Sequence, residues 1–376
     1  MASRSLDELA SRFQDRLKAV KDRTRLESGD WYPWRSLSSM QMMGRELGVS
    51  VDRLMQMVGN APALDAGCGD GDVAFFLESL GARVDAVDHP STNYNRMEGL
   101  RALKQALGSN VAIHVADIDS RAEFPNSKYG MAMLLGVLYH LKNPFLVLDT
   151  LARSSRWLYM STRIAAMTPD RRLRFGSYPM AYLVDDRELN DDPTNFWIFS
   201  EEGLKRLVRR AGWRETGYFT LGKSAGEADP VTEEGDVRAF ILAESRFAIA
   251  ENLTLGPGWH ELEYGSSRWT ERRFSVSIDV PQTLAPATLR FTFQIPDSLI
   301  AARPKTTLWA SVNGLRLPAV EYVTAGEHEY SAVVPSVPEG RVAIEFELAA
   351  AARIGSDERE LGVQVYFTGA SPIQLK

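Results

Sequence analysis

The feature that most constrains this 376-residue chain is a glycine-rich turn between a predicted strand and a predicted helix. Leu64 to Gly71 reads LDAGCGDG, with glycine at three alternate positions. Residues 61–64 read as a short buried strand, and residues 72–80 carry the apolar stripe of a helix. Such a turn leaves backbone N–H groups at the start of a helix, where glycine lets a ligand approach the main chain. The sequence therefore predicts a ligand-binding loop after the first strand.

Three kinds of ligand loop resemble this pattern. A dinucleotide loop, G-x-G-x-x-G/A, needs a small residue at the position of Asp72, and a phosphate-binding P-loop needs a lysine that the segment lacks. The segment is similar to the first motif of class I S-adenosylmethionine (SAM)-dependent methyltransferases, D-x-G-x-G-x-G. Asp65, Gly67, Gly69 and Gly71 match that motif without a gap. A glycine-rich turn without a ligand is the remaining alternative.

Polar residues follow the next predicted strands at the positions where members of this family contact SAM. Residues 82–87 form a strand that ends at Asp88, where an acid accepts hydrogen bonds from the ribose hydroxyls. Residues 111–115 form the third strand and precede the position that contacts adenine in the family, and residues 129–135 form the fourth. The resemblance implies SAM as the cofactor, bound by Asp65, Gly67, Cys68, Gly69, Asp88, His89, Asp117, Ile118, Gly136 and Tyr139.

The periodicity of the chain predicts three parts. Residues 1–60 form an N-terminal helical cap, because Leu6, Phe13 and Leu17 recur at helical spacing. Residues 61–249 alternate strand and helix, which predicts a Rossmann-like α/β methyltransferase domain with a mostly parallel, seven-stranded sheet. Residues 250–376 show only short alternating runs, which predict an all-β jelly roll or sandwich of a carbohydrate-binding-like type.

Composition limits the partners and the compartment. The net charge of -6 gives no general attraction to nucleic acid. The single cysteine, Cys68, excludes an intrachain disulfide and a cysteine-based metal site, and no other metal-ligand spacing is present, so no metal is expected. The first residues lack the apolar core of a signal peptide, and the apolar run at 131–141 is too short to cross a membrane. We therefore expect a cytoplasmic protein without a transmembrane segment.

The segment after the fourth strand refines the resemblance. Residues 135–144 read LGVLYHLKNP and resemble the G-V-L-Y-H-x-x-x-P stretch of the bacterial tRNA wobble-uridine carboxymethyltransferase and its relatives, with a likeness that covers roughly residues 30–245. In that enzyme a tyrosine and an arginine, at positions similar to Tyr139 and Arg238, hold the carboxylate of carboxy-SAM. The Trp/Lys-rich N-terminal signature of that enzyme is not present here, so SAM itself is the expected donor.

Two other segments supply candidates for acceptor binding. The aromatic segment 31–35 precedes the first strand, and the insertion 162–197 follows the fifth strand, where this fold commonly builds its acceptor cap. Core packing and a solvated surface loop are the respective alternatives. With the arginine of the last strand, the substrate-binding candidates are Trp34, Arg35, Arg163, Tyr178 and Arg238.

Methyl transfer to a hydroxyl group needs a base for the proton that is released. His140, next to Tyr139, is the candidate because it follows the fourth strand, beside the donor methyl by analogy with the fold. Tyr139 is the second catalytic candidate. A structural role for His140 under the turn at Pro144 is the alternative.

The C-terminal part suggests the acceptor. Three clusters, at 258–263, 267–270 and 357–363, resemble a β-sandwich module appended to bacterial glycosyltransferases and other glycan enzymes. Core tryptophans and a structural Asp357–Arg359 ion pair are the alternative. The resemblance implies O-methylation of a sugar, glycan or related small-molecule acceptor. A tRNA-modifying (carboxy)methyltransferase and a non-catalytic SAM-binding protein remain alternatives, and the oligomeric state is left open.

Overall fold

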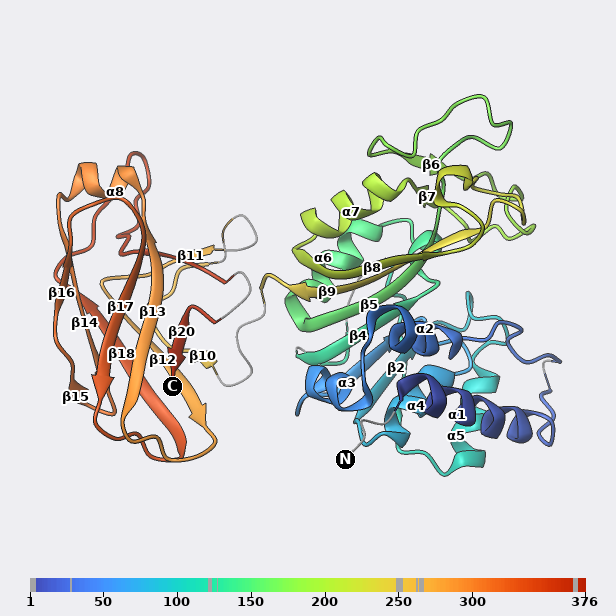
Figure 1. Cartoon of the computed structure of the whole chain (residues 1–376), viewed down its shortest axis with the longest axis horizontal. Helices are drawn as coiled ribbons and strands as arrows, with labels where there is room; N and C mark the ends of the chain where they lie inside the picture. Colours follow the sequence, from blue (N-terminus) through green and yellow to red (C-terminus); the bar gives the residue numbers. More distant parts are fainter. Residues whose placement is uncertain are drawn as a thin grey trace. The chain divides into compact units, whose positions relative to one another are not determined.

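The computed structural model describes residues 5–27, 29–120, 124–126, 128–247, 253–261, 263, 267–367 and 371–376. The chain divides into two compact units, residues 1–245 and residues 246–376 (Figure 1). The predicted boundary between residues 249 and 250 lies outside the described residues.

Three helices precede the sheet of the first unit: α1 (Leu6–Lys21), α2 (Ser38–Leu47) and α3 (Val51–Val58). The α1 helix begins where the Ser5 side chain accepts a hydrogen bond from the Glu8 N–H, an N-cap that satisfies a free backbone donor. Its apolar stripe is buried, and the rings of Phe13 and Phe76 lie 5.6 Å apart. Burial of this stripe attaches α1 to the helices that cover the sheet.

The central sheet is mostly parallel. Its strands β1 (Ala63–Ala66), β2 (Val84–Asp88), β3 (Ala112–Val115), β4 (Tyr129–Leu135) and β5 (Ser155–Ile164) run parallel in the order β3-β2-β1-β4-β5. Antiparallel β9 (Val237–Ser245) pairs with β5, and β8 (Trp213–Leu221) pairs with β9. The connecting helices are α4 (Asp72–Ser79), α5 (Glu98–Leu107), α6 (Pro144–Ser154) and α7 (Glu201–Arg210). The predicted α/β class with a mostly parallel sheet is confirmed.

The sheet is larger than the seven strands predicted. Among the described residues it has nine strands, because β6 (Ala181–Leu183) and β7 (Trp197–Phe199) of the insertion join its edge. The β7 strand pairs with the last residue of β5, Ile164, and β6 pairs antiparallel with β7. Each added strand has three residues, too few to show an alternating pattern, so the sequence did not reveal them. Two short 3-10 turns, η1 (Leu138–His140) and η2 (Ala225–Glu227), complete the unit.

The second unit consists of two antiparallel sheets that share one core. One sheet contains β10 (Leu253–Leu255), β12 (Arg273–Val280), β18 (Gly340–Leu348), β14 (Thr306–Val312), β15 (Leu315–Arg316) and β16 (Val320–Tyr322). The other contains β11 (Ser267–Trp269), β19 (Gln364–Tyr366), β13 (Ala287–Ile295), β17 (Gly326–Val334) and β20 (Ile373–Leu375). A short helix, α8 (Asp297–Ala302), follows β13. Phe346 of the first sheet packs on Phe291 of the second at 4.7 Å, as expected for facing sheets.

No helix in the described part of the chain combines the length and the apolar character needed to span a membrane.

Candidate functional site

The glycine loop forms at the carboxyl end of β1 as predicted from its spacing. Gly67, Gly69 and Gly71 all have positive φ angles, of 70°, 58° and 84°, which only glycine adopts without strain. A Cβ atom on Gly67 would lie 2.5 Å from Cγ2 of Val137. The turn after β4 therefore packs directly on the glycine loop, and this contact brings the two predicted motifs together.

Asp88, at the end of β2, fixes the loop from the other side. Its Oδ2 accepts hydrogen bonds from the Gly69 N–H at 2.8 Å and from Nδ2 of Asn93 at 3.0 Å, and its Oδ1 accepts one from the His89 N–H at 2.7 Å. Burial raises the pKa of Asp88, and these hydrogen bonds oppose the rise. Oδ1 accepts a single hydrogen bond from the described chain, so it retains a lone pair for a ribose hydroxyl.

Two other residues that were predicted to bind SAM are buried at the glycine loop. Asp65 lies at 3% exposure, its Oδ2 accepts the Ala74 N–H at 3.1 Å, and burial raises its pKa to about 7. Cys68 is buried as well, and burial raises the pKa of its thiol. A thiol with a raised pKa is a packing group and a poor nucleophile at neutral pH.

The lysine that pairs with the acidic side chains of the glycine loop was not predicted from the sequence. Nζ of Lys21, at the end of α1, lies 3.2 Å from Asp70 and 2.9 Å from Asp72, both of which are buried. Asp70 also accepts hydrogen bonds from the Tyr32 N–H at 2.9 Å and from Nδ2 of Asn95 at 2.7 Å. These partners lie 25 to 51 positions apart in sequence, so residue spacing could not have identified them.

The aromatic segment before β1 lies beside the glycine loop. A Cβ atom on Gly69 would meet the Tyr32 ring at 3.7 Å, and burial raises the pKa of Tyr32 to about 12. The Tyr32 ring lies 5.1 Å from that of Trp34 and 6.0 Å from that of Tyr94. Trp34 is 55% exposed, and its neighbour Arg35 is also exposed. Trp34 therefore presents an exposed aromatic ring near the glycine loop.

Tyr139, in η1, meets Arg238 of β9 above Gly136. The Arg238 guanidinium lies 5.8 Å from the centre of the Tyr139 ring, and a Cβ atom on Gly136 would be 3.8 Å from both side chains. Gly136 has a φ of 72°, a conformation that glycine adopts readily. These three predicted residues therefore lie together.

His140 is held by the insertion after β5. Its Nδ1 lies 2.9 Å from Oγ1 of Thr194 and 3.2 Å from the Thr194 carbonyl oxygen. The Thr194 hydroxyl donates to Oδ1 of Asp192 at 2.7 Å. Burial lowers the pKa of His140, although Asp192, 4.0 Å away, opposes this shift. The Asp192–Thr194 pair was not predicted, because it lies more than 50 residues from His140 in a segment without periodicity.

The remaining predicted residues lie in more varied places. Asp117 and His89 follow β3 and β2, as their positions in the motif imply, and Ile118 beside Asp117 is buried. Asp117 accepts the backbone N–H of Asp119 at 3.0 Å. Tyr178 is 63% exposed, in the insertion.

Arg163 has a structural environment. It is 5% exposed, and its Nη2 donates to the carbonyl oxygens of Asp229, at 3.1 Å, and Thr232. Its register partner across the β5–β9 pair is Arg238, and Asp236 lies 3.7 Å from one guanidinium and 3.8 Å from the other. Most donors of Arg163 are thus already used to hold the loop before β9.

No set of three or more His, Cys, Asp or Glu side chains is placed to hold a metal ion within the described ranges. The groups around the glycine loop instead fit an organic cofactor with a ribose. A ligand can closely approach the glycine main chain, and the buried Asp88 carboxylate has a free lone pair.

Comparison with known proteins agrees with this geometry. Residues 41–216 match the family model described as a methyltransferase domain. No curated protein matches the chain significantly.

Solved structures resemble the chain weakly. A SAM-dependent methyltransferase from Mesorhizobium loti is 14% identical, with a TM-score of 0.39, over 52% of this chain and 95% of that one. The 1,6-didemethyltoxoflavin-N1-methyltransferase of Burkholderia thailandensis is 20% identical, with a TM-score of 0.35, over 52% and 76%. The N-terminal domain of EvdMO1, solved with S-adenosylhomocysteine and D-fucose, is 16% identical, with a TM-score of 0.39, over 63% and 97%. Scores of this size do not distinguish one acceptor from another.

The family match covers the glycine loop, the Asp88 network and the Tyr139–His140 turn. Residues 41–216 therefore resemble a methyltransferase domain, and SAM is the cofactor that such a domain uses.

Proposed function

We propose that the first unit transfers the methyl group of SAM to a hydroxyl group of a sugar, glycan or related small acceptor. The observation that carries the proposal is the orientation of His140. A carbonyl oxygen only accepts hydrogen bonds, so the contact between Nδ1 and the Thr194 carbonyl assigns the hydrogen of the neutral ring to Nδ1. Nε2 then carries a lone pair, and it makes no hydrogen bond with any residue in the described part of the chain.

A base of this kind is needed by a hydroxyl acceptor. SAM, when bound, supplies the methyl group and its own leaving group. As the new O–CH₃ bond forms, the hydroxyl proton passes to Nε2 of His140. Asp192 and Thr194 hold the ring in the required tautomer, and the lowered pKa of His140 keeps it neutral near pH 7. Tyr139 and Arg238 lie together beside Gly136, in the turn that packs on the glycine loop, and are the candidates for positioning the acceptor.

The sugar class of the acceptor is supported by the resemblance of the second unit to modules of glycan enzymes. The tRNA alternative has less support. The basic cluster that could contact RNA consists of Lys205, Arg206, Arg209, Arg210 and Arg214, and it is partly neutralised. Lys205 pairs with Glu201 at 2.8 Å and Arg214 pairs with Glu244. That cluster therefore resembles a solvated helix face more than a phosphate-binding surface.

The test uses methyl-labelled SAM, the purified full chain and a lysate of its source, separated into glycan, RNA and small-molecule fractions. We expect ribonuclease-resistant label in a glycan or lipid-linked sugar fraction. His140→Gln should lower the transfer rate by about 10²- to 10⁴-fold, as for loss of a general base, while the affinity for S-adenosylhomocysteine stays unchanged. His328→Gln, at a half-buried histidine of the second unit, is the matched control.

Four results would contradict the proposal. Ribonuclease-sensitive label would favour the tRNA alternative. Label only on small molecules without a sugar would refute the acceptor class. Full activity of His140→Gln would refute the assigned base, and the absence of any transfer by the wild type would favour a SAM-binding protein without catalysis.

A further inference from the structure

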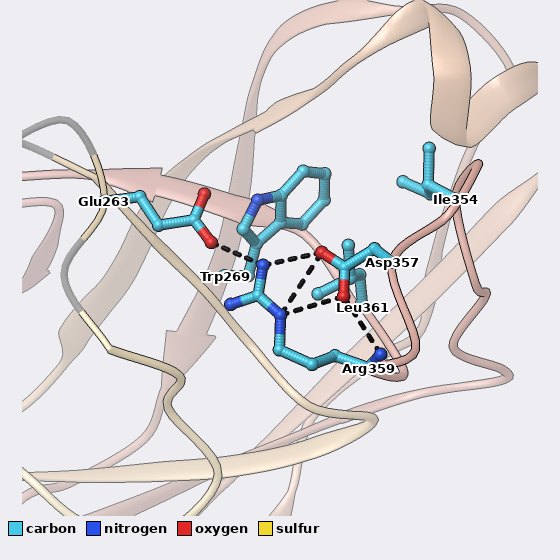
Figure 2. A pocket seen from close by; sticks show the side chains of 6 residues that line it. All are labelled: Glu263, Trp269, Ile354, Asp357, Arg359 and Leu361. Carbon is cyan, nitrogen blue, oxygen red and sulfur yellow. Dashed lines mark hydrogen bonds and ion pairs between the residues drawn. The ribbon is translucent and has the colours of Figure 1, made fainter.

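The second unit contains a pocket that the methyltransferase chemistry does not use. It lies where Glu263 and Trp269 meet the loop 352–361. Isolated bridges pair Glu263 with Ser267 and Ala352 with Leu361. Its volume of about 390 Å³ falls within the range of roughly 300–1,000 Å³ typical of small-molecule sites. The lining residues, shown in Figure 2, are Glu263, Trp269, Ile354, Asp357, Arg359 and Leu361.

The polar side of the pocket is a fixed network of three charged groups. Nε of Arg359 donates to Oδ1 of Asp357 at 3.0 Å, and Nη2 donates to Oδ2 of Asp357 at 2.6 Å and to Oε1 of Glu263 at 2.5 Å. Figure 2 shows the guanidinium between the two carboxylates. The hydrogen bonds from Arg359 lower the pKa of Asp357 to about 2, so the Asp357–Arg359 pair persists across the physiological pH range. The network therefore presents groups in a preformed orientation.

The network has unused hydrogen-bonding capacity. Nη1 of Arg359 and Oε2 of Glu263 make no hydrogen bond within the described residues, which leaves two N–H donors and a carboxylate acceptor available. The side chains of Arg359, Glu263 and Asp357 are 37%, 23% and 28% exposed, so a ligand can reach them. The charges of Arg359, Asp357 and Glu263 are paired with one another, but Arg359 and Glu263 can still form hydrogen bonds with a ligand.

The charge of the network restricts the ligand. Two carboxylates and one guanidinium carry a formal charge of -1, so a phosphate or carboxylate ligand would be repelled by Glu263 and Asp357. The other walls are apolar: the Trp269 indole, Ile354 and Leu361. A ligand that fits must be neutral, must both donate and accept hydrogen bonds on one side, and must have an apolar face on the other.

We propose that this pocket binds a neutral saccharide, whose adjacent hydroxyl groups bond to Arg359 and Glu263 while a C–H face packs on the apolar wall. Adjacent hydroxyls each donate and accept, which matches a guanidinium edge beside a carboxylate. The ligand class agrees with the proposed function and in that respect rests on it. Binding here can nevertheless be measured without SAM and without methyl transfer.

The experiment measures binding to the full chain by saturation-transfer difference NMR and calorimetric titration. The probes are the methyl glycosides of glucose, mannose, galactose and rhamnose, with maltose, cellobiose and, as the anionic comparison, glucose 1-phosphate. We expect at least one neutral probe to bind, and its affinity to fall about tenfold or more in Arg359→Ala and in Glu263→Gln. Arg273→Ala removes another ion pair of the same unit, with Glu347 at 2.9 Å, and should leave binding unchanged.

Glu263→Gln preserves an oxygen for Arg359 and serves as the test if Arg359→Ala does not fold. Failure of every neutral probe to bind, binding that both variants leave unchanged, or tighter binding of glucose 1-phosphate than of neutral hexoses would each overturn the proposal. Saccharide binding without methyl transfer to any sugar would leave this pocket established and refute only the acceptor in the proposed function.

Discussion

Replacing Lys21 by methionine tests whether the charge at the end of α1 stabilises the glycine loop. Nζ of Lys21 contacts Asp70 at 3.2 Å and Asp72 at 2.9 Å, and these carboxylates have side-chain exposures of 2% and 5%. Methionine keeps the length and the apolar stem of the side chain and removes only the charge. The two acids would then be buried beside each other without a cation.

The expected loss follows from that burial. Removing one partner of a buried ion pair lowers the free energy of unfolding by about 3–5 kcal/mol. The loss must depend on pH, because burial already raises the pKa of Asp72 and Lys21 opposes the rise. Without Lys21 this pKa rises further above its unfolded value, so the variant regains stability as pH falls through the raised pKa toward the ordinary aspartate range. The deficit should be largest at and above neutral pH.

Calorimetric unfolding of the full chain at several pH values measures this loss. The transition of the first unit is the one that S-adenosylhomocysteine shifts to higher temperature. Lys18→Met, on the same helix, is the matched control, because Lys18 pairs with Asp22 where both side chains are more than half exposed, and it should change stability by less than about 0.5 kcal/mol. Adding Asp72→Asn to Lys21→Met should restore part of the stability. A loss equal to that of the control, or one that does not change with pH, would refute the reasoning.

Three further predictions concern the donor loop and the base. Gly67→Ala should weaken SAM binding at least tenfold, because it adds a clash to the strain of a positive φ; Gly48→Ala, with a φ of 64° and no atom within 4 Å of the new Cβ, isolates the strain. Asp88→Asn should lower SAM affinity in titration calorimetry by roughly 10- to 100-fold, since charged acceptors contribute about 1.5–3 kcal/mol per hydrogen bond; unchanged affinity would place the ribose elsewhere. The rate kcat/KM should rise with pH through a midpoint below the ordinary histidine value, because burial lowers the pKa of His140, and Thr194→Val should shift that midpoint; a flat profile would exclude His140 as the base.

The strands that the sequence predicted correctly are those long or regular enough to carry a period. In the first unit, β1 to β4 lie within two residues of their predicted bounds, because each is a mainly apolar run of strand length. In the second unit, the alternating residues at 273–280, 306–312 and 341–348 predict the strands observed as β12, β14 and β18. Strands of two or three residues, such as β6, β7 and β15, contain less than two full alternations. They can be recognised only by their hydrogen bonds with neighbouring strands.

The candidate site divides in a similar way. The glycine loop and Asp88 were visible because backbone conformation demands glycine at fixed places and the strand end fixes the acid. The contacts that orient the predicted base were not visible, because Thr194 reaches His140 through a turn with no repeating pattern. Arg163 shows the opposite case: its residue type suggested substrate binding, while its burial and two carbonyl partners give it a structural contact that sequence cannot distinguish.

The N-terminal segment takes part in the donor site as well as covering the sheet. Lys21 neutralises Asp70, the Tyr32 N–H donates to the same carboxylate, and the Tyr32 ring closes the space over Gly69. Each contact joins a residue before β1 to the loop after it, so the loop has its full set of partners only when residues 21–32 are in place. Because glycine can adopt many backbone conformations, the loop keeps its positive φ angles only when its surroundings fix them, so the charge and ring of this segment contribute to the loop conformation that SAM needs. Changes in α1 should therefore alter SAM affinity without touching any residue of the donor motif.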